Sequence, residues 1–164
     1  MKKIILNVVF LSMIGTGIAQ NQVVDAFNKS YAYEAEQDYM NALSAITKVY
    51  DATSYTLNLR LGWLYYLSGD YPKSQGYYKK AIALEPQSIE ARLGYVYPAS
   101  SMENWDDVIK IYLEILAIDP NNSLVNYRLA YIYNYRKEFA KAASFAQSVV
   151  TIYPFDFNAN YLLG

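Results

Sequence analysis

Residues 60–86 read RLGWLYYLSGDYPKSQGYYKKAIALEP, and features of this stretch recur later in the chain. Its opening letters return as RLGYVY from Arg92 and as RLAYIY from Arg128. The proline that closes the stretch, Pro86, is the first of three evenly spaced prolines, followed by Pro120 and Pro154. These prolines lie 34 residues apart. A fixed period of 34 residues indicates a repeat architecture, in which each unit is one small supersecondary motif.

Each unit is expected to hold two helices. After Tyr71, Trp105 and Phe139, which keep the spacing of the prolines, apolar residues recur in steps of three and four up to the proline. This spacing marks one face of an amphipathic helix, and the proline ends the helix because it cannot donate the next backbone hydrogen bond. The segment before each of these helices places a small residue beside a large one, as in Leu61-Gly62. A recurring small residue in mid-helix indicates close contact with a neighbouring helix.

This pattern resembles the tetratricopeptide repeat, which has Leu-Gly, a Tyr three residues after the Gly, then an Ala, a large aromatic residue and a closing Pro. The positions that agree in the clearest unit are Leu61, Gly62, Tyr65, Gly69-Asp70-Tyr71, Tyr78, Ala81 and Pro86. The resemblance implies an all-α fold, an α-solenoid of stacked antiparallel helix pairs in a right-handed superhelix. We expect units at about residues 23–54, 55–88, 89–122 and 123–156, and the start of a further unit at 157–164.

The third unit departs from the other units. The interval from Arg60 to Arg92 is two residues shorter than the interval between the prolines, and the interval from Arg92 to Arg128 is two residues longer. We therefore expect the first helix of this unit to begin two residues early. The turn that starts at Pro98 is then two residues longer, and we expect a kinked or extended loop there.

The first 19 residues are predicted to be a signal peptide. A short positive start precedes an apolar run from Ile4 to Ile14, and small residues lead up to Ala19. The run is shorter than the roughly 20 apolar residues that span a bilayer, although an uncleaved anchor is the alternative. We expect cleavage after Ala19 and export to a bacterial periplasm or cell surface, which leaves residues 20–164 as a single domain without a membrane span.

The composition argues against several classes of chemistry. The chain has no histidine and no cysteine, which removes disulfides, the Ser-His and Cys-His nucleophile pairs and most metal sites. The adjacent pair Asp106-Asp107 stands where a helix is expected to begin, and acidic residues there favour the positive end of the helix dipole. We therefore expect no enzymatic activity, no cofactor and no metal.

The charge balance bears on the kind of partner. Without Lys2 and Lys3, the 14 Lys and Arg of the chain become 12 against 15 Asp and Glu, a net charge of −3. Nucleic-acid binding depends on many basic contacts to phosphates. The absence of a basic surplus therefore argues against a nucleic-acid partner.

The first helix of each unit is expected to line the concave face of the solenoid. Taking the face away from Leu61 and Tyr65, and its counterparts in the other units, we predict a binding set of Phe27, Tyr31, Arg60, Trp63, Tyr66, Arg92, Tyr95, Tyr127, Arg128, Tyr131 and Tyr135. None of the three arginines in this set has a carboxylate four residues away on its own helix. They form a ladder for carboxylates or peptide backbone, or they pair with acids on neighbouring helices or are simply solvated. The rings are either ligand contacts or core.

The leading hypothesis is a noncatalytic scaffold that binds an extended peptide or a segment of a partner protein. Some members of the family hold a peptide's terminal carboxylate with Lys and Asn, but aromatic residues such as Tyr31 and Trp63 stand at those places here. One alternative is a cell-wall glycan that stacks on the rings. Another is a helper region of a longer enzyme or assembly factor.

The last residues, FNANYLLG, read as the opening of another unit without a capping helix. Terminal units of a solenoid normally need a polar cap. Either the sequence is a fragment of a longer protein, or the bare end is covered by a partner or by a second copy of the chain.

Overall fold

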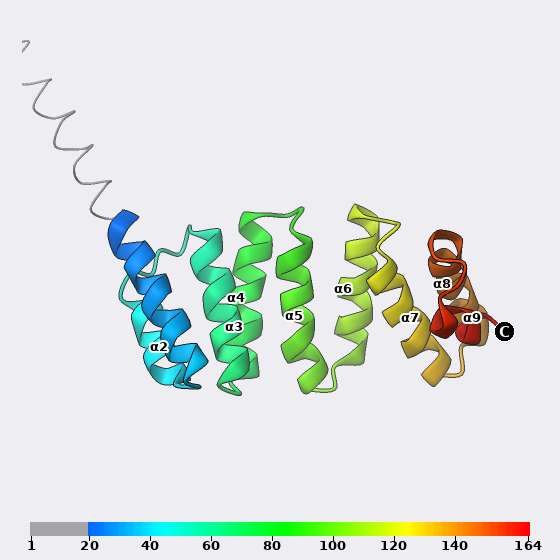
Figure 1. The fold of residues 1–164 in the computed structure, drawn as a ribbon, viewed down its shortest axis with the longest axis horizontal. Coiled ribbons are helices and arrows are strands. Elements are labelled where there is room, and N and C mark those ends of the chain that lie inside the picture. The colour runs from blue at the N-terminus through cyan, green and yellow to red at the C-terminus, as the bar shows by residue number, and fades with distance from the viewer. Residues whose placement is uncertain (1–19) are drawn as a thin grey trace, which may run out of the picture. The chain divides into compact units, whose positions relative to one another are not determined.

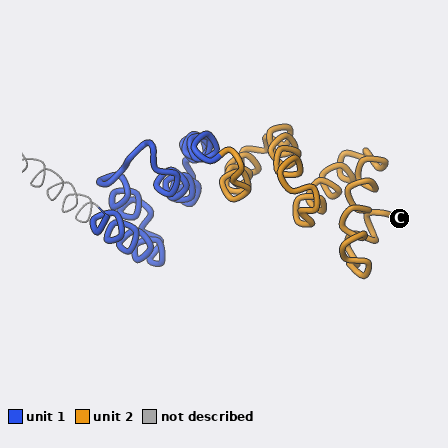
Figure 2. The backbone as a smooth tube through the Cα atoms, turned by 90° about the horizontal axis from the view of Figure 1, so that it is seen from above, with its two compact units in different colours: residues 1–85 blue, residues 86–164 orange. Residues whose placement is uncertain are grey.

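The computed structural model of this protein describes residues 20–164, which form helices joined by short turns, with no strand in that range (Figure 1). The chain divides into two compact units, residues 1–85 and 86–164 (Figure 2). The predicted signal peptide lies outside the described residues, so its cleavage stays a prediction. Within residues 20–164, no helix combines the length and the apolar character needed to cross a membrane.

Unit 1 consists of a helix at residues 20–35, α2 (Tyr39–Thr47), α3 (Tyr55–Leu67) and α4 (Tyr71–Leu84). Its core is a cluster of buried apolar side chains from the first three of these helices: Ala26, Ala42, Leu43, Ile46, Leu57, Leu61 and Leu64. The helix at 20–35 and α2 therefore form a first pair, against which α3 packs.

Unit 2 consists of α5 (Ile89–Ser101), α6 (Trp105–Ile118), α7 (Ser123–Tyr135), α8 (Phe139–Ile152) and α9 (Phe157–Leu163). Each helix contacts the next along the chain, and α9 also contacts α7. Buried apolar side chains from successive helices fill the space between them, among them Val108, Ile115, Val125, Leu129 and Val149. The predicted all-α fold of stacked helix pairs is confirmed.

Side chains of capping residues mark where the first helix of each pair, and α9, begins. Ser54, Ser88, Asn122 and Asp156 are evenly spaced at the period of the prolines, and the side chain of each accepts a hydrogen bond from the backbone N–H three residues later. These bonds satisfy donors that a helix leaves unpaired at its first turn. The period of the repeat is therefore present in the caps as well as in the apolar pattern.

For the third pair, both expectations are wrong: the first helix does not begin two residues early, and no kinked or extended loop begins at Pro98. Helices α3, α5 and α7 each have 13 residues and begin at equal intervals along the chain. Helix α5 continues through Pro98 and ends at Ser101, so the following turn is no longer than in the other pairs. Proline costs this helix one hydrogen bond, to the carbonyl four residues earlier, at Gly94. The Pro98 side chain is fully buried, and burial of its apolar surface contributes favourably to stability.

A consequence concerns Arg92, which the recurring motif had aligned with Arg60. Counted from the start of each helix, Arg92 stands at the position of Asn58 and Asn126. The three side chains also act alike, because each donates a hydrogen bond to the backbone carbonyl four residues earlier, at 3.0 Å for Arg92, 2.8 Å for Asn58 and 3.0 Å for Asn126. The letters Arg-Leu-Gly are thus displaced by two positions in α5.

Candidate functional site

Arg60 is a buried residue of unit 1 that joins α3 to the helix at 20–35. Only 6% of the residue is exposed. Its guanidinium forms an ion pair with the carboxylate of Glu34 and donates two hydrogen bonds, from Nε and Nη2, to the hydroxyl of Ser30 at 3.0 and 2.9 Å. The alternative of pairing with an acid on a neighbouring helix therefore describes Arg60 correctly.

The other predicted residues of unit 1 gather around this ion pair. The Tyr31 ring lies over the guanidinium, with its centroid 4.0 Å from Cζ of Arg60. The indole N–H of Trp63 donates to Oε1 of Glu34 at 2.7 Å. Ring contacts extend the group from Tyr31 to Phe27 and from Trp63 to Tyr66. These residues form one connected group, the Arg60 cluster: Phe27, Tyr31, Arg60, Trp63 and Tyr66.

Three predicted residues of unit 2 have a different environment. Arg92 is 8% exposed, and its Nε lies 3.3 Å from Oε2 of Glu114. Tyr95 is 2% exposed and donates its hydroxyl to Oδ2 of Asp107 at 2.9 Å. Burial, and then this hydrogen bond, raise the pKa of Tyr95 to about 12. Tyr127 is half-buried and lies outside the pocket of this unit. The displaced register explains why Arg92 and Tyr95 pack between helices.

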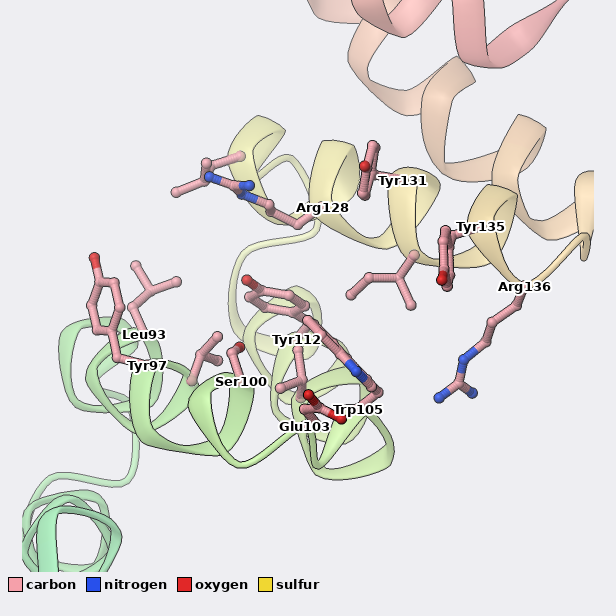
Figure 3. Close-up of a pocket in the computed structure, with 14 residues that line it drawn as sticks. Leu93, Tyr97, Ser100, Glu103, Trp105, Tyr112, Arg128, Tyr131, Tyr135 and Arg136 are labelled. Carbon is pink, nitrogen blue, oxygen red and sulfur yellow. The ribbon is translucent and has the colours of Figure 1, made fainter. Parts of the chain in front are cut away.

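Unit 2 contains a pocket of about 760 Å³ between α5, α6 and α7, called here the Arg128 pocket (Figure 3). The predicted residues Arg128, Tyr131 and Tyr135 line it from α7. The remaining lining residues are Leu93, Val96, Tyr97, Ser100, Glu103, Trp105, Val108, Tyr112, Leu124, Ile132 and Arg136. The structure therefore brings part of the predicted set together with residues that the sequence did not single out.

The two arginines that line the Arg128 pocket differ in their ion pairing. Arg128 is exposed and makes no hydrogen bond or ion pair with another described residue. Arg136, at the end of α7, pairs with Asp106 at 2.8 Å, and the Asp106 side chain is 89% exposed. Glu103 is the one carboxylate among the lining residues that the structure describes. Arg128 is thus a cation available to a ligand.

The residues that meet between α5 and α6 differ from those that meet between α3 and α4. In the preceding pair, Gly62 faces Tyr78 so closely that a Cβ on the glycine would lie 3.0 Å from the ring. One period later these positions hold Val96 and Tyr112. Both Val96 and Tyr112 line the pocket.

Three aromatic residues that line the pocket were not predicted as site residues from the sequence: Tyr97, Trp105 and Tyr112. The signal for Tyr97 was present, because it lies midway between Trp63 and Tyr131, one period from each. Alignment by this period selects Tyr97 for the exposed face, where alignment by the letters Arg-Leu-Gly selected Tyr95. Trp105 and Tyr112 had no such signal, since they belong to the regular apolar pattern.

Metal ligands do not gather in the described part of the chain. No group of three or more His, Cys, Asp or Glu side chains within residues 20–164 is placed to hold a metal ion. The candidate site is therefore described by its aromatic rings and by the guanidinium of Arg128.

Family models and solved structures were compared with the chain. Models of the tetratricopeptide repeat match residues 56–88 and 125–156. A comparison with the curated proteins found no significant match to the sequence.

Similar folds among solved structures belong to repeat proteins of low sequence identity. A tetratricopeptide repeat protein from Parabacteroides merdae has a TM-score of 0.78 and 14% identity, over 87% of this chain and 57% of that one. The C-terminal part of a repeat-containing protein from Cytophaga hutchinsonii has a TM-score of 0.79 and 14% identity, over 88% and 61%. MamA protein has a TM-score of 0.74 and 19% identity, over 88% and 80%.

The chain thus spans little more than half the length of the Parabacteroides merdae protein. The family models and the solved structures agree on the nature of the repeat, and the first helices of the pairs recur at its regular period. The chain belongs to the tetratricopeptide repeat family.

Proposed function

We propose that this protein is a noncatalytic interaction scaffold that binds an extended peptide segment of a partner protein in the Arg128 pocket. Repeats of this family generally form surfaces for protein interaction. The observation that carries the proposal is the unpaired guanidinium of Arg128 in a pocket with four aromatic rings from α6 and α7. Tyr, Trp and Arg are the residue types that dominate binding energy at protein interfaces.

The composition of the pocket suits a peptide better than a flat protein surface. It combines apolar walls, which provide contact area, with a few polar groups, which orient a ligand. Tyr97 and Tyr131 are 51% and 56% exposed, so the pocket is open to solvent. An extended segment can therefore enter it and continue past it.

The Arg60 cluster is proposed as a second contact surface, on unit 1. Tyr31 is 56% exposed and offers one face of its ring, while the other face is held by Arg60. Arg60 therefore acts as a positioning residue, because its donors are already used by Ser30 and Glu34. The proposed ligand contacts here are Tyr31 and Trp63.

Location outside the cytoplasm is part of the same proposal. It is supported by the apolar run of Ile4 to Ile14 with its positive start and small residues before Ala19. The partner would then be a protein of the periplasm or cell surface. Mass spectrometry of the precursor and of the exported protein tests the predicted cleavage, because cleavage after Ala19 would make Gln20 the first residue of the exported form.

Selection from a random peptide display library on the immobilised protein tests the proposed function. We expect enriched peptides whose binding falls at least about tenfold in Tyr131→Ala, because one buried aromatic contact is worth about 1.4 kcal/mol or more. The matched control is Tyr161→Ala, which removes an aromatic side chain that is 76% exposed on α9, outside the pocket. Equal binding by the two variants contradicts the proposal.

A glycan array probed in parallel tests the alternative ligand class. Exposed rings also stack on sugars, and Tyr135 at the pocket rim is 83% exposed. Binding to cell-wall oligosaccharides that Tyr131→Ala abolishes, with no peptide enriched, would replace the peptide proposal by the glycan alternative.

A further inference from the structure

We propose that Tyr112 and Arg128 together form a carboxylate subsite in the Arg128 pocket, which takes the acidic side chain of a partner peptide beside a bulky apolar residue. This inference rests on the proposed function and specifies the ligand of the same pocket. It places one ligand contact on α6 and one on α7, whereas the sequence analysis expected contacts only from the first helix of each pair.

The first observation is an unused donor in the lining of the pocket. Tyr112 is 7% exposed, yet its hydroxyl makes no hydrogen bond with any described residue. The hydroxyl is not among the side-chain polar atoms that are both buried and unpaired, so it stays accessible to solvent in the pocket. Burial also raises the pKa of Tyr112, so at neutral pH the phenol keeps its proton and can donate it. A ligand acceptor in the pocket would satisfy this group.

The second observation is the position of Arg128 relative to that hydroxyl. The positive charge of Arg128 acts on Tyr112 and opposes the effect of burial on its pKa. Figure 3 shows the hydroxyl end of Tyr112 and the guanidinium of Arg128 turned toward the same side of the pocket. Two donors, neither paired with an acceptor among the described residues, therefore point to the same side of the pocket, and the charge of Arg128 acts on the phenol.

The chemistry of these donors identifies the acceptor. A guanidinium only donates hydrogen bonds and carries a positive charge, and its fork geometry matches a carboxylate. A phenol next to it can donate to the same group. The other arginine of the lining, Arg136, is already paired with Asp106, so Arg128 carries the positive charge of the lining that has no ion-pair partner among the described residues. An anionic ligand group complements that charge.

The rest of the pocket indicates what stands beside the carboxylate. Trp105 and Ile132 offer apolar surface from α6 and α7. In Figure 3 Trp105 and Glu103 lie away from the Arg128 guanidinium, toward Arg136. A bulky apolar side chain adjacent to the acidic one would cover this surface while the acid stays clear of Glu103. Because the pocket is open at its rim, a peptide can continue past it on both sides. The carboxylate therefore belongs to the side chain of an Asp or Glu within a peptide segment.

Fluorescence anisotropy with labelled synthetic peptides tests the subsite. The probes are C-terminally amidated decapeptides of Gly and Ser that carry a central Phe-Glu or Phe-Gln pair, and a third probe ends in Phe-Gln with a free C-terminus. We expect the Phe-Glu peptide to bind about tenfold or more tightly than amidated Phe-Gln, as for a hydrogen-bonded charge. The free-acid probe should bind like amidated Phe-Gln.

Variants assign the preference to the two donors. Arg128→Gln and Tyr112→Phe should each reduce binding of the Phe-Glu peptide toward that of Phe-Gln and leave Phe-Gln binding unchanged. The matched control is Arg136→Gln, which removes a nearby guanidinium that is already paired and should keep most of the preference. Far-UV circular dichroism and thermal unfolding of each variant verify that the fold is retained.

Each contrary result overturns the subsite. The subsite is overturned if no probe binds, if Phe-Glu is not preferred over Phe-Gln, or if the preference survives both Arg128→Gln and Tyr112→Phe. Tight binding of the free-acid probe would show that the pocket takes a C-terminal carboxylate instead of an acidic side chain. Failure of the scaffold proposal is distinguishable, because it is read from the library selection with Tyr131→Ala. Peptides selected there without any acidic residue would uphold the scaffold and reject the subsite.

Discussion

The guanidinium of Arg60 and the carboxylate of Glu34 form an ion pair between α3 and the helix at residues 20–35, where the Arg60 side chain is only 5% exposed. Removal of one partner of such a pair leaves the other charge buried without compensation. We expect Glu34→Gln to lower the free energy of unfolding by about 3 kcal/mol, measured by urea denaturation.

The control for this prediction lies on the same helix. Lys29 and Asp25 form an ion pair whose two side chains are each 62% exposed, and exposed pairs contribute about 0–1 kcal/mol. Asp25→Asn should therefore change the stability far less than Glu34→Gln. Equal effects of the two substitutions would show that Arg60 reaches solvent.

Gly62 is predicted to be essential for the contact between α3 and α4. A Cβ at this position would lie 3.0 Å from three atoms of the Tyr78 ring, and Tyr78 is 3% exposed. We expect Gly62→Val to destabilise the protein by about 1–3 kcal/mol through overpacking. In contrast, a Cβ at Gly76 of α4 meets nothing within 4 Å, so Gly76→Ala should stabilise by up to about 1 kcal/mol. Thermal unfolding of both variants compares the two effects.

Asn126 is predicted to anchor the turn before α7. Its side-chain amide donates to the carbonyl oxygens of Pro120 and Asn122, each at 3.0 Å, and the residue is 2% exposed. Asn126→Ala leaves both acceptors without this partner and should cost about 1–3 kcal/mol in urea denaturation. The exposed neighbour Asn121 provides the control. A loss no larger than that of Asn121→Ala would contradict the anchoring role.

Tyr95 is predicted to make the stability of the protein fall at alkaline pH. Its pKa is raised to about 12 in the folded protein, above the value of about 10 for an unfolded chain. Below about pH 10 the phenol is neutral in both states, so its contribution is fully present. Between about pH 10 and 12 the unfolded chain loses a proton that the folded chain keeps, and the free energy of unfolding decreases.

Urea denaturation across that range tests this prediction. Tyr95→Phe should show a smaller loss of stability from pH 9 to about pH 11.5 than the parent protein. Tyr135→Phe, at a position that is 83% exposed, should leave the loss unchanged. The same pH dependence in Tyr95→Phe as in the parent protein would refute the role of the Tyr95 hydroxyl.

Much of the fold was predictable because its determinants are local. The prolines, the capping residues and the steps of three and four act within a single helix or turn, so they can be read along the chain. The exposed positions of Tyr131 and Tyr135 follow from the same helical spacing. One error also has a local cause: the letters of the motif at Arg92 were taken as the register, whereas the caps at Ser54 and Ser88 set it.

The sequence by itself determined that the chain forms helix pairs with a regular period. Only the tertiary structure decided which guanidinium groups are used inside the fold and which is available. Arg60 and Arg92 find carboxylates on other helices, whereas Arg128 finds none among the described residues. Such partners depend on which helix faces come together, and this is set by packing between helices rather than by the spacing of residues within one helix.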